Sequence, residues 1–148
     1  MNDRPPGHPT ILVAEDEEQL REALVEMLLT RGFDVVGVAT TGTEAVALAA
    51  ASDPQLVLMD YRMPEMDGVM ATEAIKERSP GTRVVMFTAY DETSLSLDAT
   101  RAGVSAFLVK GCAPSLILQA LGNALERRRD PDEAARAATT ESSAQGAL

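Results

Sequence analysis

The sequence predicts an α/β fold in which helices cover both faces of a parallel sheet. Short apolar runs alternate with longer segments whose apolar residues have helical spacing. The runs are rich in Val and Leu and mostly continuous, which is typical of strands buried on both faces. They span residues 11–14, 33–38, 56–59, 84–87 and 106–109. We therefore expect a doubly wound, flavodoxin-like sheet of five parallel strands in the order 2-1-3-4-5, with five helices.

The first two helices have recognisable ends. After Asp16, apolar residues recur at three- and four-residue spacing, and Gly32 follows where a helix C-terminus favours glycine. Thr41 and Glu44 form a capping box for the second helix. Asp16 could itself cap the first helix, because Asp is favoured at N-cap positions.

The remaining helices are predicted from their apolar faces. The third follows Gly68 and directs Ala71, Ala74 and Ile75 inward. The fourth runs from about Glu92 to Ala102 and is a weak helix by composition. The fifth follows Pro114 and places one set of apolar residues on a common face: Leu116, Ile117, Ala120, Leu121, Ala124 and Leu125.

Composition and charge exclude several classes of protein. The net charge is −10, and residues 10–128 hold 10 basic against 18 acidic residues, so direct binding to nucleic acid or to an anionic membrane is disfavoured. The single cysteine, Cys112, and the single histidine, His8, exclude an intrachain disulfide and a histidine-based metal cage. Without a membrane-spanning apolar run or an apolar signal peptide, we expect a cytoplasmic protein.

The chain is predicted to hold one folded domain. Residues 10–128 contain all the alternating segments. Residues 1–9 are rich in Pro and Gly and are expected to form a flexible tail. Residues 129–148 are small and polar, so we expect a mostly disordered C-terminal tail.

Five polar residues fall where predicted strands end. Glu15 and Asp16 follow the first strand, Asp60 the third, Thr88 the fourth and Lys110 the fifth. Open α/β sheets bind ligands beyond the carboxyl ends of their strands, so the fold should gather these residues at one edge. They are therefore the candidate functional residues.

The chemistry of this set points to a metal ion and a phosphoryl group. Three clustered carboxylates repel one another, and a divalent cation relieves the repulsion. Oxygen ligands at an open edge favour Mg²⁺, with Mn²⁺ as the alternative. The cation and Lys110 would form a positive pocket to which Thr88 adds a hydroxyl donor. Asp60, at the end of the central strand, is then the best candidate for a nucleophile that forms an acyl phosphate.

Four sequence blocks resemble the signature blocks of two-component response regulator receiver domains of the chemotaxis-regulator type. They occur in the family's order over about residues 10–128. The blocks are Glu15-Asp16, Leu58 to Gly68 (LMDYRMPEMDG), Phe87-Thr88-Ala89 and Phe107 to Lys110 (FLVK).

The resemblance implies a role for each matching residue. Asp60 would accept a phosphoryl group from a histidine kinase or phosphotransfer protein. Asp16 and Asp60 would bind Mg²⁺ directly, together with the backbone carbonyl of Arg62, and Glu15 would support the metal through water. Thr88 and Lys110 would contact the phosphoryl group. The chain would thus be a phosphoacceptor switch rather than an enzyme.

The resemblance also implies how the signal leaves the domain. Phe107 falls at the switch-aromatic position and would turn inward when Thr88 moves toward the phosphoryl group. The face of the fourth helix, fifth strand and fifth helix would then change its affinity for an output partner, which the sequence does not name. Arg62 and Tyr90 occupy the variable positions that tune dephosphorylation in this family.

Two departures from the family pattern stand out. The acidic pair is Glu-Asp where many members have Asp-Asp, which affects the metal geometry. Gly111 follows Lys110 where proline with a cis peptide bond is common, so the sequence leaves that bond's geometry open.

Other functions fit the sequence less well. A haloacid-dehalogenase-like phosphatase requires a second acid two residues after its nucleophile, where this chain has Arg62. A flavin- or nucleotide-binding module requires a phosphate-binding loop after the first strand, where acidic residues lie instead.

A phosphorylation-independent interaction module on the same fold is the strongest rival. Within the receiver reading, the segment from Phe107 to Leu125 resembles receivers that precede a helix-turn-helix domain. The chain is then either a stand-alone regulator, as the tail favours, or the receiver part of a longer protein. It is expected to be a monomer or a phosphorylation-dependent homodimer.

Overall fold

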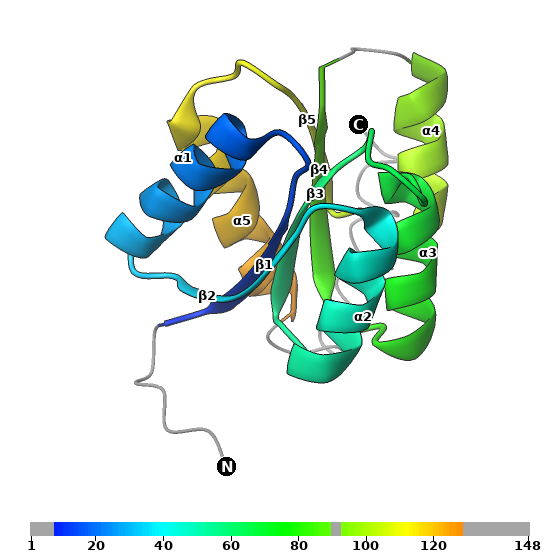
Figure 1. Ribbon diagram of the computed structural model, residues 1–148, viewed down its shortest axis with the longest axis horizontal. Helices are drawn as coiled ribbons and strands as arrows, with labels where there is room; N and C mark the ends of the chain where they lie inside the picture. Colours follow the sequence, from blue (N-terminus) through cyan, green and yellow to red (C-terminus); the bar gives the residue numbers. More distant parts are fainter. Residues whose placement is uncertain (1–7, 90–92, 129–148) are drawn as a thin grey trace, which may run out of the picture.

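The computed structural model describes residues 8–89 and 93–128, without the side chains of residues 93, 94, 127 and 128. Within these residues, strands and helices alternate along the chain (Figure 1). The strands are β1 (Thr10–Ala14), β2 (Asp34–Ala39), β3 (Leu56–Asp60), β4 (Arg83–Thr88) and β5 (Ala106–Val109). The helices are α1 (Glu18–Thr30), α2 (Gly42–Ser52), α3 (Gly68–Arg78), α4 (Thr93–Ala102) and α5 (Pro114–Arg128).

The strands form one parallel sheet in the order β2-β1-β3-β4-β5. This confirms the predicted doubly wound, flavodoxin-like arrangement. The central strands β1 and β3 are buried at every position, as their continuous apolar runs predict. In the register of the sheet, Asp60 lies beside Phe87 and Thr88 lies beside Val109, so the polar ends of β3 and β4 meet at one edge.

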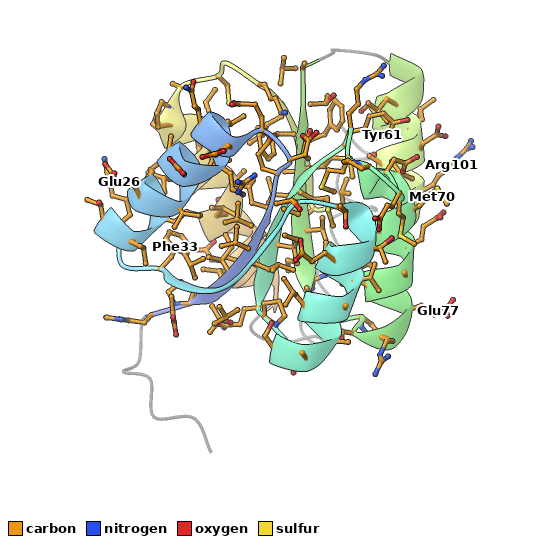
Figure 2. The ribbon with its side chains drawn as sticks, viewed as in Figure 1. Glu26, Phe33, Tyr61, Met70, Glu77 and Arg101 are labelled. Atoms are coloured by element: carbon orange, nitrogen blue, oxygen red, sulfur yellow. The ribbon has the colours of Figure 1, made fainter. Side chains whose placement is uncertain are left out.

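Alternate residues of each strand build two separate cores. Ile11 and Val13 point to the face covered by α1 and α5, where they pack with Leu58 and Leu121. Their neighbours in β1 point to the opposite face, which α2, α3 and α4 cover. Figure 2 shows side chains filling the space between the sheet and both helical layers. A fully buried Leu such as Leu58 stabilises the fold by about 1.5–3 kcal/mol.

The N-terminus of α1 differs from the simplest expectation. Glu17, rather than Asp16, is the N-cap, and its carboxylate accepts hydrogen bonds from the backbone N–H groups of Gln19 and Leu20 at 3.0 and 2.9 Å. The alternative role of Asp16 as a helix cap is therefore wrong. At α2, the Thr41 hydroxyl accepts the Glu44 N–H at 3.0 Å, as the capping box predicts.

Two faces differ from those that the helical spacing predicts. Leu116 lies in the first turn of α5 and is 46% exposed, although its helical spacing matches that of the buried residues Ala120 and Ala124. In α3, Ala71 and Ile75 are buried as expected, but Ala74 is only partly buried and Thr72 is fully buried. The Thr72 hydroxyl donates to the Gly68 carbonyl at 2.7 Å, so its polar group is satisfied inside the helix.

Some predictions fall outside the described residues. These are the start of the fourth helix at Glu92, Tyr90, the C-terminal tail at 129–148 and residues 1–7 of the N-terminal tail. Across the described part of the chain, none of the helices has both the length and the apolar character needed to cross a bilayer.

Candidate functional site

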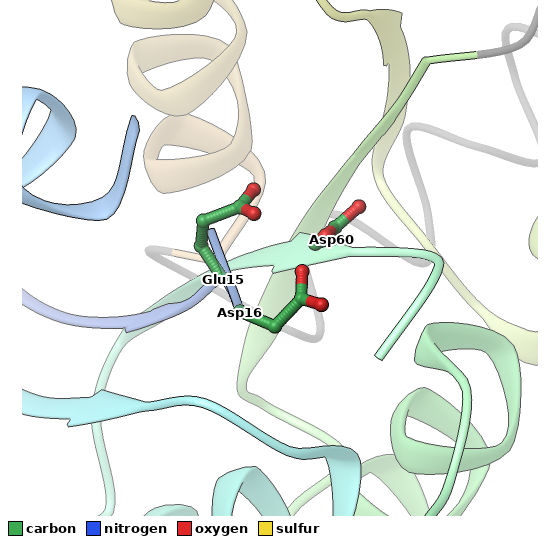
Figure 3. Close-up of side chains that lie close together, drawn as sticks. All are labelled: Glu15, Asp16 and Asp60. Carbon is green, nitrogen blue, oxygen red and sulfur yellow. The ribbon is translucent and has the colours of Figure 1, made fainter. Parts of the chain in front are cut away.

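Three carboxylates meet at the carboxyl edge of the sheet. Glu15 and Asp16 follow β1, and Asp60 is the last residue of β3 (Figure 3). One oxygen of each lies within 4.8 Å of the others. Glu15 and Asp60 are buried, whereas Asp16 is exposed. The parallel strands thus bring together all three acids that the sequence predicts at this edge.

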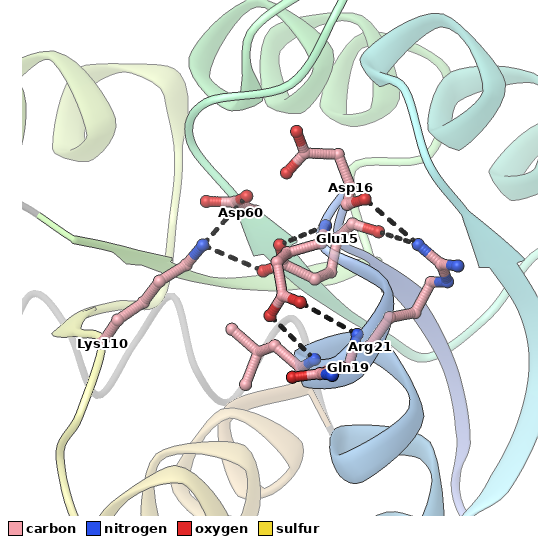
Figure 4. Close-up of polar contacts among 8 residues, drawn as sticks. Glu15, Asp16, Gln19, Arg21, Asp60 and Lys110 are labelled. Carbon is pink, nitrogen blue, oxygen red and sulfur yellow. Dashed lines mark hydrogen bonds and ion pairs between the residues drawn. The ribbon is translucent and has the colours of Figure 1, made fainter.

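Lys110 lies against two of these acids. Its Nζ is 3.0 Å from Glu15 Oε1 and 3.1 Å from Asp60 Oδ2 (Figure 4). The same ammonium group lies 5.2 Å from the centre of the Phe87 ring, within cation–π range. Burial lowers the pKa of Lys110, but hydrogen bonds and charges from Glu15 and Asp60 outweigh burial and raise the pKa overall. Lys110 therefore stays a cation at neutral pH.

The surroundings of Asp60 disfavour the charged form of its carboxylate. Burial and the neighbouring charge of Glu15 raise the pKa of Asp60 to about 7, against a smaller lowering by Lys110, and Asp16 adds a further increase. One ammonium group thus does not balance three carboxylates. The potential ligand atoms are carboxylate oxygens whose negative charge exceeds the one positive charge of Lys110, which fits a hard divalent cation such as Mg²⁺.

The peptide and carboxylate of Glu15 are held on several sides. Its N–H donates to the Ala39 carbonyl of β2 at 3.0 Å. Its Oε2 accepts the Glu17 N–H at 2.9 Å, and its Oε1 faces Lys110. Glu15 is therefore fixed as a buried partner of Lys110, which favours an indirect contact with a metal rather than a direct one.

Thr88 lies next to this cluster, whereas Phe107 lies deeper along β5. Thr88 is fully buried at the end of β4, and its carbonyl accepts the Lys110 N–H at 2.6 Å. This bond ties the end of β4 to the residue that follows β5. Phe107 is partly buried and lies beside Met86 in the register of β4 and β5. Its side chain packs against the core on the α2, α3 and α4 side.

The segment after Asp60 leads directly into α3. The Tyr61 N–H donates to the Phe87 carbonyl at 3.1 Å, which extends the ladder between β3 and β4 by one residue. Arg62 follows in the loop, with an exposed side chain. Tyr90, the other predicted tuning residue, is outside the described residues.

Two glycines allow this loop to fold closely over the site. A Cβ at Gly68 would collide with the Asp60 carbonyl oxygen, and a Cβ at Gly42 would collide with the Met66 carbonyl oxygen. Gly68 also donates its N–H to the Tyr61 carbonyl at 2.7 Å. The loop from Tyr61 to Asp67 is therefore held against β3 and the start of α2.

The backbone after Lys110 resolves the question that the sequence left open. No cis peptide bond occurs among the described residues, so the bond between Lys110 and Gly111 is trans. Gly111 has φ +94°, a conformation that favours glycine.

Phe87 and Arg21 are site residues that sequence reasoning missed. Phe87 lies below Lys110, and Arg21 donates to the backbone carbonyls of Glu15 and Asp16. The contact of Phe87 could have been expected only from its register beside Asp60. For Arg21, the sequence offers one signal, which is its position in the helix that directly follows the acidic pair.

Comparisons with known proteins identify the family of this chain. The family model of the response regulator receiver domain matches residues 11–122. The chain is 36% identical over 115 residues to the chemotaxis protein CheY of Bacillus subtilis, covering 78% of this chain and 96% of that protein. It is 39% identical over 120 residues to the transcriptional regulatory protein PdtaR of Mycobacterium tuberculosis, covering 81% of this chain and 58% of PdtaR.

Solved structures show the same fold. The signal receiver domain of NarL from Mycobacterium tuberculosis has a TM-score of 0.77 at 33% identity, over 82% of this chain and 98% of that one. CheY in the CheX–CheY–BeF3–Mg complex of Borrelia burgdorferi has a TM-score of 0.72 at 27% identity, over 76% and 85% of the two chains. The chain belongs to the response regulator receiver domain family.

Proposed function

We propose that this receiver domain accepts a phosphoryl group on Asp60 from a histidine kinase or phosphotransfer protein, in a reaction that depends on Mg²⁺. The observation that carries the proposal is the placement of Asp60. It is a nearly buried carboxylate 3.1 Å from the Lys110 ammonium group, with two further acids beside it. Membership of the receiver family supports the same role.

Asp16 and Asp60 would hold the metal directly, with the Arg62 carbonyl as a third protein ligand, and Glu15 would support it through water. Mn²⁺ could replace Mg²⁺. When bound, the cation would neutralise charge on the phosphoryl oxygens and on the carboxylates. The CheY of Borrelia burgdorferi, which was solved with BeF3 and Mg²⁺, supports a metal and a phosphoryl-like ligand in a related protein.

The transfer itself requires a positioned nucleophile. An oxygen of Asp60 would attack the phosphorus of phosphohistidine, forming a P–O bond while the P–N bond breaks and its electron pair leaves with the imidazole. Lys110, whose pKa is raised by its acidic neighbours, would remain charged and pair with the phosphoryl oxygens. The Thr88 hydroxyl would donate to another of these oxygens.

The proposed output runs through α4, β5 and α5. Thr88 would move toward the phosphoryl group, and Phe107 would turn inward into the space beside it. Leu97 on α4 and Leu116 on α5 are 55% and 46% exposed, so both helices offer an apolar group to a protein partner. The output partner would be another protein, and the domain would be a monomer or a phosphorylation-dependent homodimer.

Several further assignments belong to this proposal. The receiver domain would span residues 10–128 with tails on both sides, and the protein would act in the cytoplasm as a switch rather than an enzyme. Its acidity disfavours direct contact with nucleic acid or membrane. Arg62 and Tyr90 would tune the lifetime of the acyl phosphate.

The proposal is tested by incubating the chain with Mg²⁺ and acetyl phosphate and recording its intact mass. We expect one added phosphoryl group, prevented by EDTA and absent from the Asp60→Asn variant. If no group is added, beryllofluoride binding in the presence of Mg²⁺ separates fast hydrolysis from a site that takes no phosphoryl group. Failure in both assays would favour the phosphorylation-independent interaction module instead.

A further inference from the structure

Arg21 holds the loop that carries the acidic pair. It lies in the second turn of α1, and its side chain reaches back toward the end of β1 (Figure 4). Its Nη1 donates to the Glu15 carbonyl at 3.2 Å and to the Asp16 carbonyl at 3.3 Å. Its own backbone N–H donates to the Glu17 carbonyl at 2.9 Å. Arg21 thus contacts three consecutive peptide groups of the β1–α1 loop.

Both acceptors of the guanidinium group are peptide carbonyl oxygens. The contact therefore acts on the conformation of the loop and not on the charge of a carboxylate. Glu15 has other anchors, because its N–H pairs with Ala39 and its carboxylate accepts the Glu17 N–H. Asp16 is exposed, and the Arg21 contact to its carbonyl fixes the peptide from which its carboxylate projects.

We infer that Arg21 is a positioning residue for the metal site, an inference that rests on the function proposed above. By fixing the carbonyls of Glu15 and Asp16, it keeps the Asp16 carboxylate within 4.8 Å of the Glu15 and Asp60 oxygens. Without this contact, the loop can rotate its peptides toward solvent and the exposed acid is no longer confined beside its partners. Residues that orient metal ligands in this way commonly change metal affinity by about 10–100-fold.

The positive charge of Arg21 and its positioning contacts are expected to change Mg²⁺ affinity in opposite directions. The guanidinium group is held at the peptide carbonyls of two of the site's acidic residues, and its positive charge there repels an incoming dication, so its charge alone would weaken metal binding. Removing the charge would then tighten Mg²⁺ binding. Removing a positioning contact would weaken it. The two effects have opposite signs, and the sign of the change identifies the role.

The experiment is a calorimetric Mg²⁺ titration of the full chain at fixed ionic strength. Wild type is compared with Arg21→Ala and with Arg21→Lys, which keeps the charge but has a shorter side chain, so its ammonium group falls short of the position from which Nη1 reaches both carbonyls. Arg31→Ala is the matched control. Arg31 is exposed at the opposite end of the same helix, so its replacement removes one positive charge far from the site. We expect a roughly tenfold higher Kd for Arg21→Ala, an increase for Arg21→Lys, and a Kd within about twofold of wild type for Arg31→Ala.

A Kd for Arg21→Ala that is equal to or below the wild-type value would overturn the inference. The thermal unfolding midpoint without Mg²⁺ shows whether each variant is folded. If Arg21→Ala does not fold, the result for Arg21→Lys decides, and an unchanged Kd there contradicts the positioning role.

Asp16→Asn separates this inference from the proposed function. If wild type binds no Mg²⁺, or Asp16→Asn binds it as well as wild type does, the metal site itself is wrong and the inference falls with it. If Asp16→Asn loses binding while Arg21→Ala keeps it, the metal site stands and only the role of Arg21 is refuted.

Discussion

The Lys110 ammonium group lies 3.0 Å from the buried carboxylate of Glu15, and this ion pair links the end of β1 to the residue after β5. The same ammonium group is 3.1 Å from Asp60. One cation thus bridges two acids from different strands. Removal of Lys110 would leave the buried charges of Glu15 and Asp60 uncompensated. We therefore expect Lys110 to stabilise the fold as well as to serve the proposed phosphoryl site.

Lys110→Met should therefore destabilise the metal-free protein. Because the Lys110 side chain is 23% exposed, we expect a loss of about 1–3 kcal/mol, below the range for fully buried pairs. Urea unfolding at pH 7.5 measures the loss. Mg²⁺ should restore part of the stability in Lys110→Met, and a variant as stable as wild type without Mg²⁺ would contradict this role.

Asp60→Asn should stabilise the metal-free protein above neutral pH. The pKa of Asp60 is about 7 in the folded chain, against an ordinary value of 3.8 for an aspartate side chain, so the folded state binds more protons between these pH values. Stability therefore falls as pH rises from about 4 to 7, and the full penalty is present above pH 7. The variant removes this penalty, which amounts to at most about 4 kcal/mol.

The measurement is urea unfolding of both proteins in EDTA at pH 5 and pH 8. The gain from Asp60→Asn should be large at pH 8 and smaller at pH 5, and saturating Mg²⁺ should reduce it by stabilising the wild-type carboxylate. An equal gain at both pH values would show that the raised pKa of Asp60 is not its cause.

Gly68→Ala should damage the loop that follows Asp60. The added Cβ would collide with the Asp60 carbonyl, so either β3 or the start of α3 must move. We expect a loss of about 2–3 kcal/mol together with weaker Mg²⁺ binding. Gly122→Ala is the matched control, because a Cβ there meets no atom within 4 Å and lies within α5. That change should stabilise the protein by about 0.5–1 kcal/mol. Similar losses in both variants would mean that the close approach at Gly68 is unimportant.

Replacement of both Arg62 and Tyr90 by small residues should shorten the life of the phosphorylated form. Bulky side chains at these positions are expected to shield the acyl phosphate from water. Decay of the phosphorylated mass after removal of acetyl phosphate measures the half-life. An unchanged half-life would remove the shielding role from both residues.

The sequence predicts the sheet and the acidic cluster well because their signals are local. The continuous run from Ile11 to Ala14 is buried at every position, and the parallel order of the strands brings Asp60 to the same edge as Glu15 and Lys110. The capping interaction of Thr41 with Glu44 is also local, since both residues lie in one turn.

Other features depend on tertiary geometry that residue spacing does not contain. Leu116 shares helical spacing with buried residues of α5 and is nevertheless 46% exposed, because spacing does not show how far the sheet covers each turn of a helix. The contact of Phe87 with Lys110 depends on the register between strands, and that of Arg21 depends on the direction in which α1 leaves β1. If Asp16 were the N-cap, α1 would begin at Glu17. The helix begins at Glu18 instead, so Glu17 is the cap.

The most direct test of the account is to locate the phosphoryl group within the chain. After reaction with acetyl phosphate and Mg²⁺, borohydride reduces an aspartyl phosphate to homoserine and releases phosphate, and peptide mass spectrometry then identifies the converted residue. We expect conversion at position 60 alone, and none when EDTA is present. Conversion at Asp16 or another acid, or equal conversion in Asp60→Asn, would contradict the assignment of Asp60 as the phosphoacceptor.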